Sequence, residues 1–145
     1  MKKIILNSIA VLLIAIIPLS CKKGPGPGGK ATITGKIYIK NYSSNVDYST
    51  LPPSITYSFV SGYDAQNESV YIIYGDEKGV GKFVKTAADG TYVFDFLRTG
   101  NYKVYALSRD LSDSLSTGKQ IAVVKDVTIS GRKDVITLDS LVINK

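Results

Sequence analysis

Apolar and polar residues alternate with a period of two over most of the chain after residue 30, and this pattern limits the possible folds more than any other feature. In residues 32–40, Ile33, Ile37 and Ile39 share one face, and the residues between them are mostly polar or small. Such alternation is typical of a strand with one face on a core. Similar or continuously apolar runs occur at residues 70–74, 91–97, 102–108, 121–129 and 135–143. No long apolar stripe of helical period follows residue 30, so we expect an all-β, antiparallel sandwich.

Turn residues separate these runs. Asp89 and Gly90 stand between residues 82–86 and 91–97, and both tolerate a positive φ, so the pair is a strong hairpin signal. We therefore expect the two runs to pair as a central hairpin. Gly100 marks a second turn. Aromatic residues alternate after the first turn, and we expect them to share a face, with the phenylalanines in the core: Tyr92, Phe94 and Phe96.

The segment 41–69 is rich in tyrosine and has two adjacent prolines near its middle. Alternating apolar residues at 55–59 predict an extra strand, and we expect long loops on both sides of it. Tyrosines on loops offer a large contact area at a low entropy cost. The candidate partner-binding residues are therefore Tyr42, Tyr48 and Tyr63, with local packing as the other explanation of their presence.

Residues 1–20 have the features of a secretory signal peptide. Lys2 and Lys3 give a positive start, and a mostly apolar run follows from Ile4 to Leu19. This run is slightly shorter than the ~20 apolar residues that a membrane-spanning helix needs. A positive start, a short apolar core and a small residue before a processing point are typical of cleaved signal peptides.

The processing point, Pro18-Leu19-Ser20-Cys21, resembles the lipobox of bacterial lipoproteins. In that family a small residue precedes the cysteine that receives diacylglycerol. Ser20 and Cys21 fit this pattern, while Pro18 stands where a leucine is usual. The resemblance implies that Cys21, the only cysteine, is lipidated. Residues 21–30 combine this cysteine with a Gly- and Pro-rich stretch, which we expect to be a flexible tether.

The composition excludes several classes of catalytic and metal site. The chain has no histidine and one cysteine, so it can form no internal disulfide, no typical zinc site and no Ser–His–Asp or Cys–His arrangement. Its formal net charge of +6 comes from 18 basic and 12 acidic residues, with both signs spread along the chain. A nucleic-acid binder usually concentrates its basic residues. We therefore expect no catalytic residue, no metal, no cofactor and no nucleic-acid partner.

Residues 82–104 resemble the carboxypeptidase regulatory-like domain, a prealbumin-like (transthyretin-like) β-sandwich. In that family a threonine strand leads to an Asp-Gly turn, an aromatic strand and a Leu-x-x-Gly-x-Tyr motif. The matching residues are Thr86, Asp89, Gly90, Tyr92, Phe94, Leu97, Gly100 and Tyr102. The resemblance implies a Greek-key sandwich of about seven strands over residues 31–145, with 41–69 as an insertion. Tyr102 also suits the role of a corner tyrosine that bonds to the backbone.

A fold of this kind serves many functions, so the fold alone does not name one. We expect a monomeric, non-catalytic structural or binding module that is held on a membrane by its lipid and has a protein or glycan partner. A subunit of a pilus or surface assembly is an alternative, and an accessory domain of a hydrolase is a more remote one. Many Gram-negative bacteria retain lipoproteins in the inner membrane through an aspartate after the cysteine. Lys22 stands there instead, which favours the outer membrane with the domain facing the periplasm, surface exposure being the alternative.

Overall fold

The computed structural model describes residues 24–112 and 118–145. The expected signal peptide and Cys21 lie outside the described residues. The described part contains nine strands: β1 (Pro27–Asp47), β2 (Ser54–Asp64), β3 (Ser69–Tyr74), β4 (Lys82–Lys85), β5 (Thr91–Leu97), β6 (Gly100–Arg109), β7 (Gln120–Ile129), β8 (Val135–Thr137) and β9 (Leu141–Asn144). It includes no helix of the length and apolar character needed to cross a membrane.

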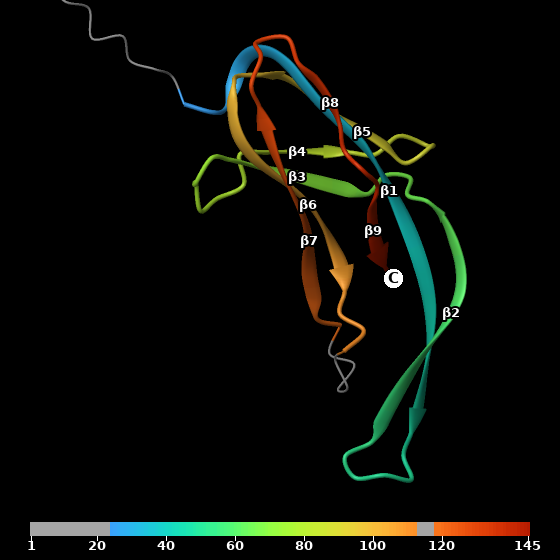
Figure 1. Ribbon diagram of the computed structural model, residues 1–145. Helices are drawn as coiled ribbons and strands as arrows, with labels where there is room; N and C mark the ends of the chain where they lie inside the picture. Colours follow the sequence, from blue (N-terminus) through green and yellow to red (C-terminus); the bar gives the residue numbers. More distant parts are fainter. Residues whose placement is uncertain (1–23, 113–117) are drawn as a thin grey trace, which may run out of the picture.

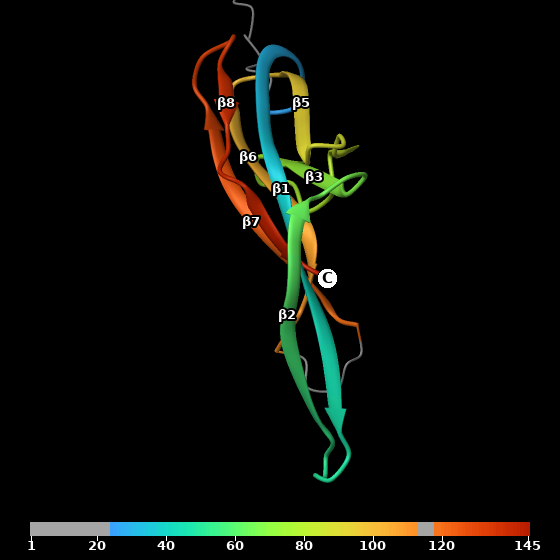
Figure 2. The ribbon, with the colours of Figure 1, turned by 90° about the vertical axis from the view of Figure 1, so that its right-hand side faces the viewer.

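The strands form two sheets that enclose one core (Figures 1 and 2). The first sheet has the order β2-β1-β5, and β8 and β9 also pair with β1; the second has the order β4-β3-β6-β7. The expected all-β sandwich is confirmed. The sandwich differs from the expected one in having nine strands and in the direction of β8 and β9, which run parallel to β1. The chain makes these parallel pairs possible by crossing from β7 in the second sheet to the first.

The core contains the residues that the period of two places on one face. In β1 these include Ile33, Ile37 and Ile39, all at least 97% buried. Tyr92 of β5 is also buried, and its ring lies across Gly35, where a Cβ would come within 2.5 Å of the tyrosine hydroxyl. That hydroxyl has no hydrogen-bond partner among the described residues, and burial raises the pKa of Tyr92 to about 12.

Phe96 departs from the alternation of its strand. Tyr92 and Phe94 enter the core as expected, but the side chain of Phe96 is 66% exposed, so its expected place in the core is wrong. The pairing between β1 and β5 shifts register near this residue, and Phe96 has φ = 58°. The irregularity adds a residue to β5 and turns Phe96 outward, while Leu97 returns to the core.

The expected tether is wrong for its second half, because the Gly- and Pro-rich stretch lies on the sandwich. Pro27 begins β1 and pairs with Leu97. Gly26 is buried, and its amide donates to the Tyr102 hydroxyl at 2.9 Å. The same hydroxyl donates to the Arg98 carbonyl at 2.7 Å. Tyr102 thus makes the backbone contacts of a corner tyrosine, and one of them holds the start of the fold.

Asp89 and Gly90 do not close a hairpin. β4 pairs with β3 in the second sheet, and β5 pairs with β1 in the first, so the turn between them carries the chain from one sheet to the other. Gly90 does have the expected positive φ, 75°. It is buried, and its carbonyl accepts a hydrogen bond from the Ile37 amide at 2.9 Å. The Asp89-Gly90 pair predicts the local φ values of a turn. It does not predict which strands pair on either side of that turn.

Replacing Gly90 with alanine should lower the free energy of unfolding by more than the cost of its φ alone. A Cβ at this position would lie 2.7 Å from the Ile37 carbonyl oxygen, which is backbone and cannot move cheaply. We expect about 1–2 kcal/mol from the left-handed conformation and a further ~1–3 kcal/mol from the packing conflict. Chemical denaturation of the purified protein measures this loss.

Gly118 provides a matched control, because its φ of 72° is nearly the same and a Cβ there would meet nothing within 4 Å. Gly118→Ala should therefore cost only the conformational part, about 1–2 kcal/mol. Equal losses for the two variants would show that the contact between Gly90 and Ile37 is not what requires the glycine.

Candidate functional site

The most prominent feature of the molecule is a two-stranded ribbon, residues 41–64, which we call the arm. It consists of the last third of β1 and the whole of β2, joined at the tip, and it extends away from the sandwich (Figures 1 and 2). The extra strand expected at 55–59 is present. The expected long loops beside it are wrong, since residues 41–47 and 60–64 are also in strands.

The register of the arm gives it two different faces, because residues directly opposite each other in an antiparallel pair share a face. Tyr42 pairs with Phe59, Ser44 with Tyr57, and Val46 with Ile55. The positions between them pair small polar residues with one another. One face, which we call the apolar face, therefore carries Tyr42, Val46, Ile55, Tyr57 and Phe59 with Ser44 among them. The other carries Ser43, Asn45, Asp47, Ser54, Thr56 and Ser58.

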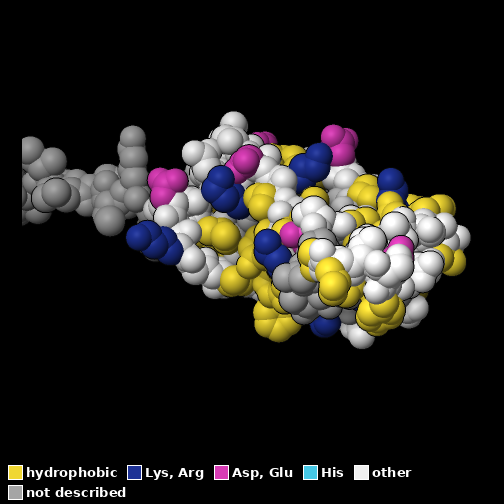
Figure 3. Space-filling view, turned by 90° about the horizontal axis from the view of Figure 1, so that it is seen from below, with side chains coloured by type: hydrophobic (Ala, Val, Ile, Leu, Met, Phe, Trp, Pro, Cys, Tyr) yellow, Lys and Arg dark blue, Asp and Glu magenta, His cyan; other side chains and the backbone are white. Residues whose placement is uncertain are grey.

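The apolar face is partly open to solvent, with Phe59 exposed and its other four apolar residues half-buried. Phe59 is 59% exposed, although its ring meets that of Tyr42 edge-on at 5.8 Å between centroids. At the tip, Tyr48 and Leu51 are 78% and 96% exposed. On the right-hand side of Figure 3, where the arm points toward the viewer, hydrophobic and uncharged side chains dominate the surface. Only two charged residues occur in the arm, Asp47 and Asp64.

The three tyrosines expected to bind a partner all lie on the arm, but not on one surface. Tyr42 is on the apolar face, and Tyr48 is at the tip. Tyr63 pairs with Ile39, which enters the core, so it lies on the opposite side of the sheet from Tyr42. The members of the apolar face that were not recognised from the sequence are Val46, Ile55, Tyr57 and Phe59.

The long edges of the arm are available for pairing. Among the described residues, β2 pairs only with β1, so its outer edge has no strand beside it. Residues 43–47 of β1 likewise pair only with β2 within the described part of the chain. Unpaired edge amides and carbonyls are a template for another strand. Natural proteins often protect such edges with lysine, and the arm contains none.

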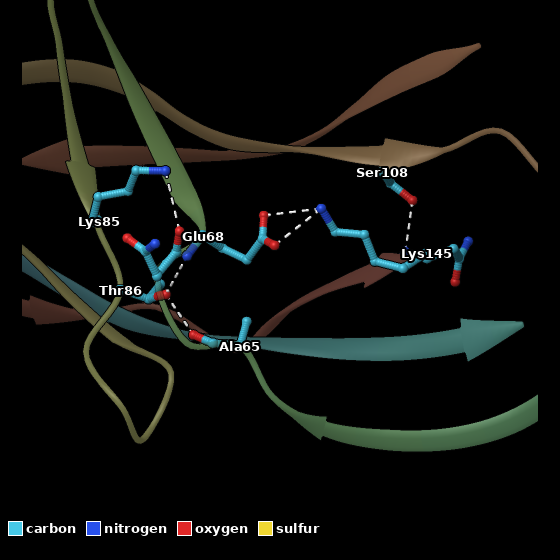
Figure 4. A network of polar contacts seen from close by, with 8 residues as sticks. Ala65, Glu68, Lys85, Thr86, Ser108 and Lys145 are labelled. Carbon is cyan, nitrogen blue, oxygen red and sulfur yellow. Dashed lines mark hydrogen bonds and ion pairs between the residues drawn. The ribbon is translucent and has the colours of Figure 1, made fainter. Parts of the chain in front are cut away.

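Polar contacts fix the base of the arm (Figure 4). The buried Thr86 hydroxyl donates to the Ala65 carbonyl and accepts from the Glu68 amide, at 2.5 and 2.9 Å. Lys145 Nζ lies 3.0 Å from the Glu68 carboxylate, and the Lys145 carbonyl accepts from the Tyr42 amide at 2.9 Å. The connection that follows the arm and the strand from which the arm starts are therefore both held to the sandwich.

The residues expected to determine the fold have structural roles. The Asp89 carboxylate accepts hydrogen bonds from the Thr91 hydroxyl and amide, at 2.6 and 3.1 Å, and these bonds lower the pKa of Asp89. Gly100 has φ = 141°, and a Cβ there would lie 2.8 Å from the Pro25 side chain. None of these residues is part of the arm. Within residues 24–112 and 118–145, no group of three or more His, Cys, Asp or Glu side chains could hold a metal ion.

Comparisons with known proteins leave the family of the chain open. No protein-family profile and no curated protein sequence matches it. Among solved structures, it is similar to the crystal structure of a proposed carbohydrate-binding protein from Pseudomonas aeruginosa, with 17% sequence identity and a TM-score of 0.42. The alignment covers 83% of this chain and 91% of that one. A likeness this distant carries no argument about function.

Removing the arm should leave the sandwich folded. We expect replacement of residues 42–60 by Asn-Gly, which joins the paired residues Asn41 and Ser61 through a two-residue turn, to change the free energy of unfolding by no more than about 2 kcal/mol. The change is this small because the arm contributes no residue to the buried core. Part of it is the lost bond from the Tyr42 amide to the Lys145 carbonyl. A thermal melt followed by circular dichroism tests this, and loss of a cooperative transition would show that the arm is part of the folding unit.

Proposed function

We propose that this chain is a lipid-anchored, non-catalytic binding module of the cell envelope and that its arm engages a partner protein. The observation that carries the proposal is that the arm has one partly exposed apolar face and one polar face, and that it contributes no residue to the core. Packing of the core therefore does not explain the apolar side chains of this face, and contact with a partner protein would explain them.

The physical properties of the arm are those of an interface. An isolated two-stranded ribbon is marginally stable in water, and covering its apolar face stabilises it by about 25 cal/mol for each Å² removed from solvent. Aromatic residues are enriched in interfaces and charged ones are depleted at their centres. Phe59, Tyr57 and Tyr42 give the apolar face three aromatic rings and no charge. Asp47 lies on the opposite face.

A polypeptide fits this surface better than a glycan does. The arm offers a row of apolar side chains beside an unpaired strand edge, and an extended polypeptide can satisfy both by adding a strand to β2. Sites for small ligands are usually concave, with a few polar groups that converge on the ligand. The apolar face is instead the flank of a ribbon that extends away from the sandwich (Figure 2).

The proposed location in the cell envelope rests on the first residues of the sequence. The apolar run ending in Ser20-Cys21 supports lipidation of Cys21, and Lys22 favours the outer membrane with the domain facing the periplasm. In Figure 1 the described chain begins at the end of the sandwich opposite the tip of the arm. A lipid on Cys21 would place the membrane at the end of the sandwich where the described chain begins, and the arm would point away from the membrane.

We expect Cys21→Ser to abolish incorporation of labelled fatty acid and to move the protein out of the membrane fraction. The cysteine thiol is the only one in the chain, so no other residue can take the thioether. Cys21→Ala should behave in the same way. Undiminished labelling of either variant would contradict the anchor.

A photo-crosslinking amino acid at position 59 should capture a discrete protein in intact cells, because this side chain lies on the apolar face and is mostly exposed. The matched control is position 58, one residue away on the polar face and also exposed. We expect several-fold less product from position 58.

Crosslinked products that are absent from the variant lacking residues 42–60 depend on the arm. The recombinant partner protein should bind the intact protein and should not bind this variant. Equal crosslinking from positions 58 and 59 would contradict the proposed face. Products that disappear after glycan digestion would assign the arm to a glycan, and a ladder of self-crosslinked copies would assign it to an assembly subunit.

A further inference from the structure

The start of the fold lies close to the proposed anchor. Gly26 is held by Tyr102, and its carbonyl accepts from the Arg98 amide at 3.0 Å. Cys21 precedes Gly24, the first described residue, by three positions. At ~3.3–3.6 Å per residue, even an extended chain covers no more than about 11 Å. A lipid on Cys21 would therefore bring this end of the sandwich into the headgroup region of the membrane.

Three cationic side chains surround one hollow at this end. Lys30, Arg98 and Arg132 line a hollow of about 340 Å³ together with Gly28, Gly29, Leu97 and Thr99. The cations come from the start of β1, the connection from β5 to β6, and the connection from β7 to β8. None of the three forms an ion pair with another described residue.

The acidic groups nearby either make hydrogen bonds or ion pairs of their own or line a different hollow. The Asp134 carboxylate accepts from the amides of Gly131 and Ser130, at 2.6 and 3.2 Å. Asp95 pairs with Lys82 at 3.7 Å. Asp76 and Glu77 line a different hollow, with Gly24 and Pro25, and neither of them lines the hollow of the three cations.

Two exposed apolar residues lie at the same level of the sheet. Phe96 is in β5 where that strand pairs with residues 31–33 of β1, and Val135 of β8 pairs with Thr32 on the other side of β1. Their side chains are 66% and 71% exposed. Phe96 also has the left-handed conformation that non-glycine residues rarely adopt. The structure thus holds an aromatic ring in solvent at an unfavourable φ, beside a cluster of cations.

We propose that this surface, which we call the basic end and which comprises Lys30, Arg98, Arg132, Phe96 and Val135, docks on anionic phospholipid headgroups. The cations bind headgroup phosphates, and Phe96 enters the boundary between headgroups and acyl chains, where aromatic side chains are favoured. The inference rests on the proposed anchor at Cys21. It adds that the domain has a fixed face toward the membrane, which keeps the arm directed away from the lipid.

The test uses the whole lipoprotein, purified from membranes in detergent and reconstituted into vesicles. The chain has no tryptophan, so Phe96→Trp introduces a single fluorescent reporter, and Phe59→Trp places the matched control on the arm. On vesicles of phosphatidylcholine mixed with phosphatidylglycerol, lipids brominated near the headgroup should quench the tryptophan at position 96 several-fold more than that at position 59. The quenching at position 96 should fall several-fold on phosphatidylcholine alone.

Charge removal tests the headgroup contact. Adding Arg98→Gln and Arg132→Gln to the Phe96→Trp protein should reduce quenching on anionic vesicles to its level on neutral ones. Removing the same charge elsewhere, by Lys40→Gln just before the arm and Lys125→Gln in β7, should leave the quenching unchanged. Equal quenching at positions 96 and 59, or no effect of the arginine changes, would overturn the proposal.

The anchor and the docking surface fail in distinguishable ways. If Cys21 carries no lipid, the protein will not float with neutral vesicles. If the anchor is present and the docking surface is wrong, the protein will float equally well but position 96 will report no lipid contact. An emission shift at position 96 caused by inorganic phosphate without vesicles would assign the hollow to a free anion and overturn the lipid assignment.

Discussion

The structure depends on one strand. β1 is 21 residues long and hydrogen-bonds to β2, β5, β8 and β9, and none of those four pairs with another strand of the sheet. Its first two thirds supply the central isoleucines of the core, and its last third forms one side of the arm. At ~3.3 Å per residue such a strand has a contour length of about 70 Å. The arm is therefore a direct continuation of a strand that supplies three isoleucines to the core, and no loop separates the two.

A second constraint acts at the opposite end of β1, where Tyr102 binds the backbone of Gly26 and Arg98. A buried hydroxyl with two backbone partners is well satisfied, and each bond to a neutral group contributes about 0.5–1.5 kcal/mol. These bonds convert residues that the composition assigns to a tether into part of the fold. The distance between the proposed lipid and the first sheet is set by this contact, because only the residues before Gly26 are left to span it.

The sequence predicts the parts of the fold that follow from local alternation. Ile33, Ile37 and Ile39 in the core, and Tyr92 and Phe94 beside them, could all be identified because a regular strand places every second residue on one face. The exposure of Phe96 could not be predicted, because one irregular backbone conformation moves its side chain to the other face of the sheet. The residue type gives no sign of that conformation. Gly90 shows the same limit for turns: its φ was predictable, but its strands pair with partners far away in the sequence.

The candidate site was only partly visible for a related reason. The alternation at 55–59 indicated a strand, but its partner, residues 42–46, has only Tyr42 and Val46 as apolar members and reads as polar. The amphipathic face emerges when both strands are placed in register. For Pro25 and its glycine neighbours the sequence predicted a flexible tether, and the structure shows an ordered part of the fold. A composition typical of linkers also suits a chain that must pass close to other backbone, as Gly29 does at the Leu97 carbonyl.

Both ends of β1 retain features that a sequence selected for stability alone would lack. A glycine at position 96 would avoid a conformational cost of about 1–2 kcal/mol, and the exposed ring gains little from packing in water. Lysines along β2 would protect its open edge from other strands. Local choices that conflict with the fold tend to occur at functional sites. Phe96 of β5 lies beside the start of β1, and Phe59 of β2 pairs with Tyr42 near its end. Contact at one end of β1 therefore leaves the other end free, and a module held on a membrane could bind a second molecule without releasing the first surface.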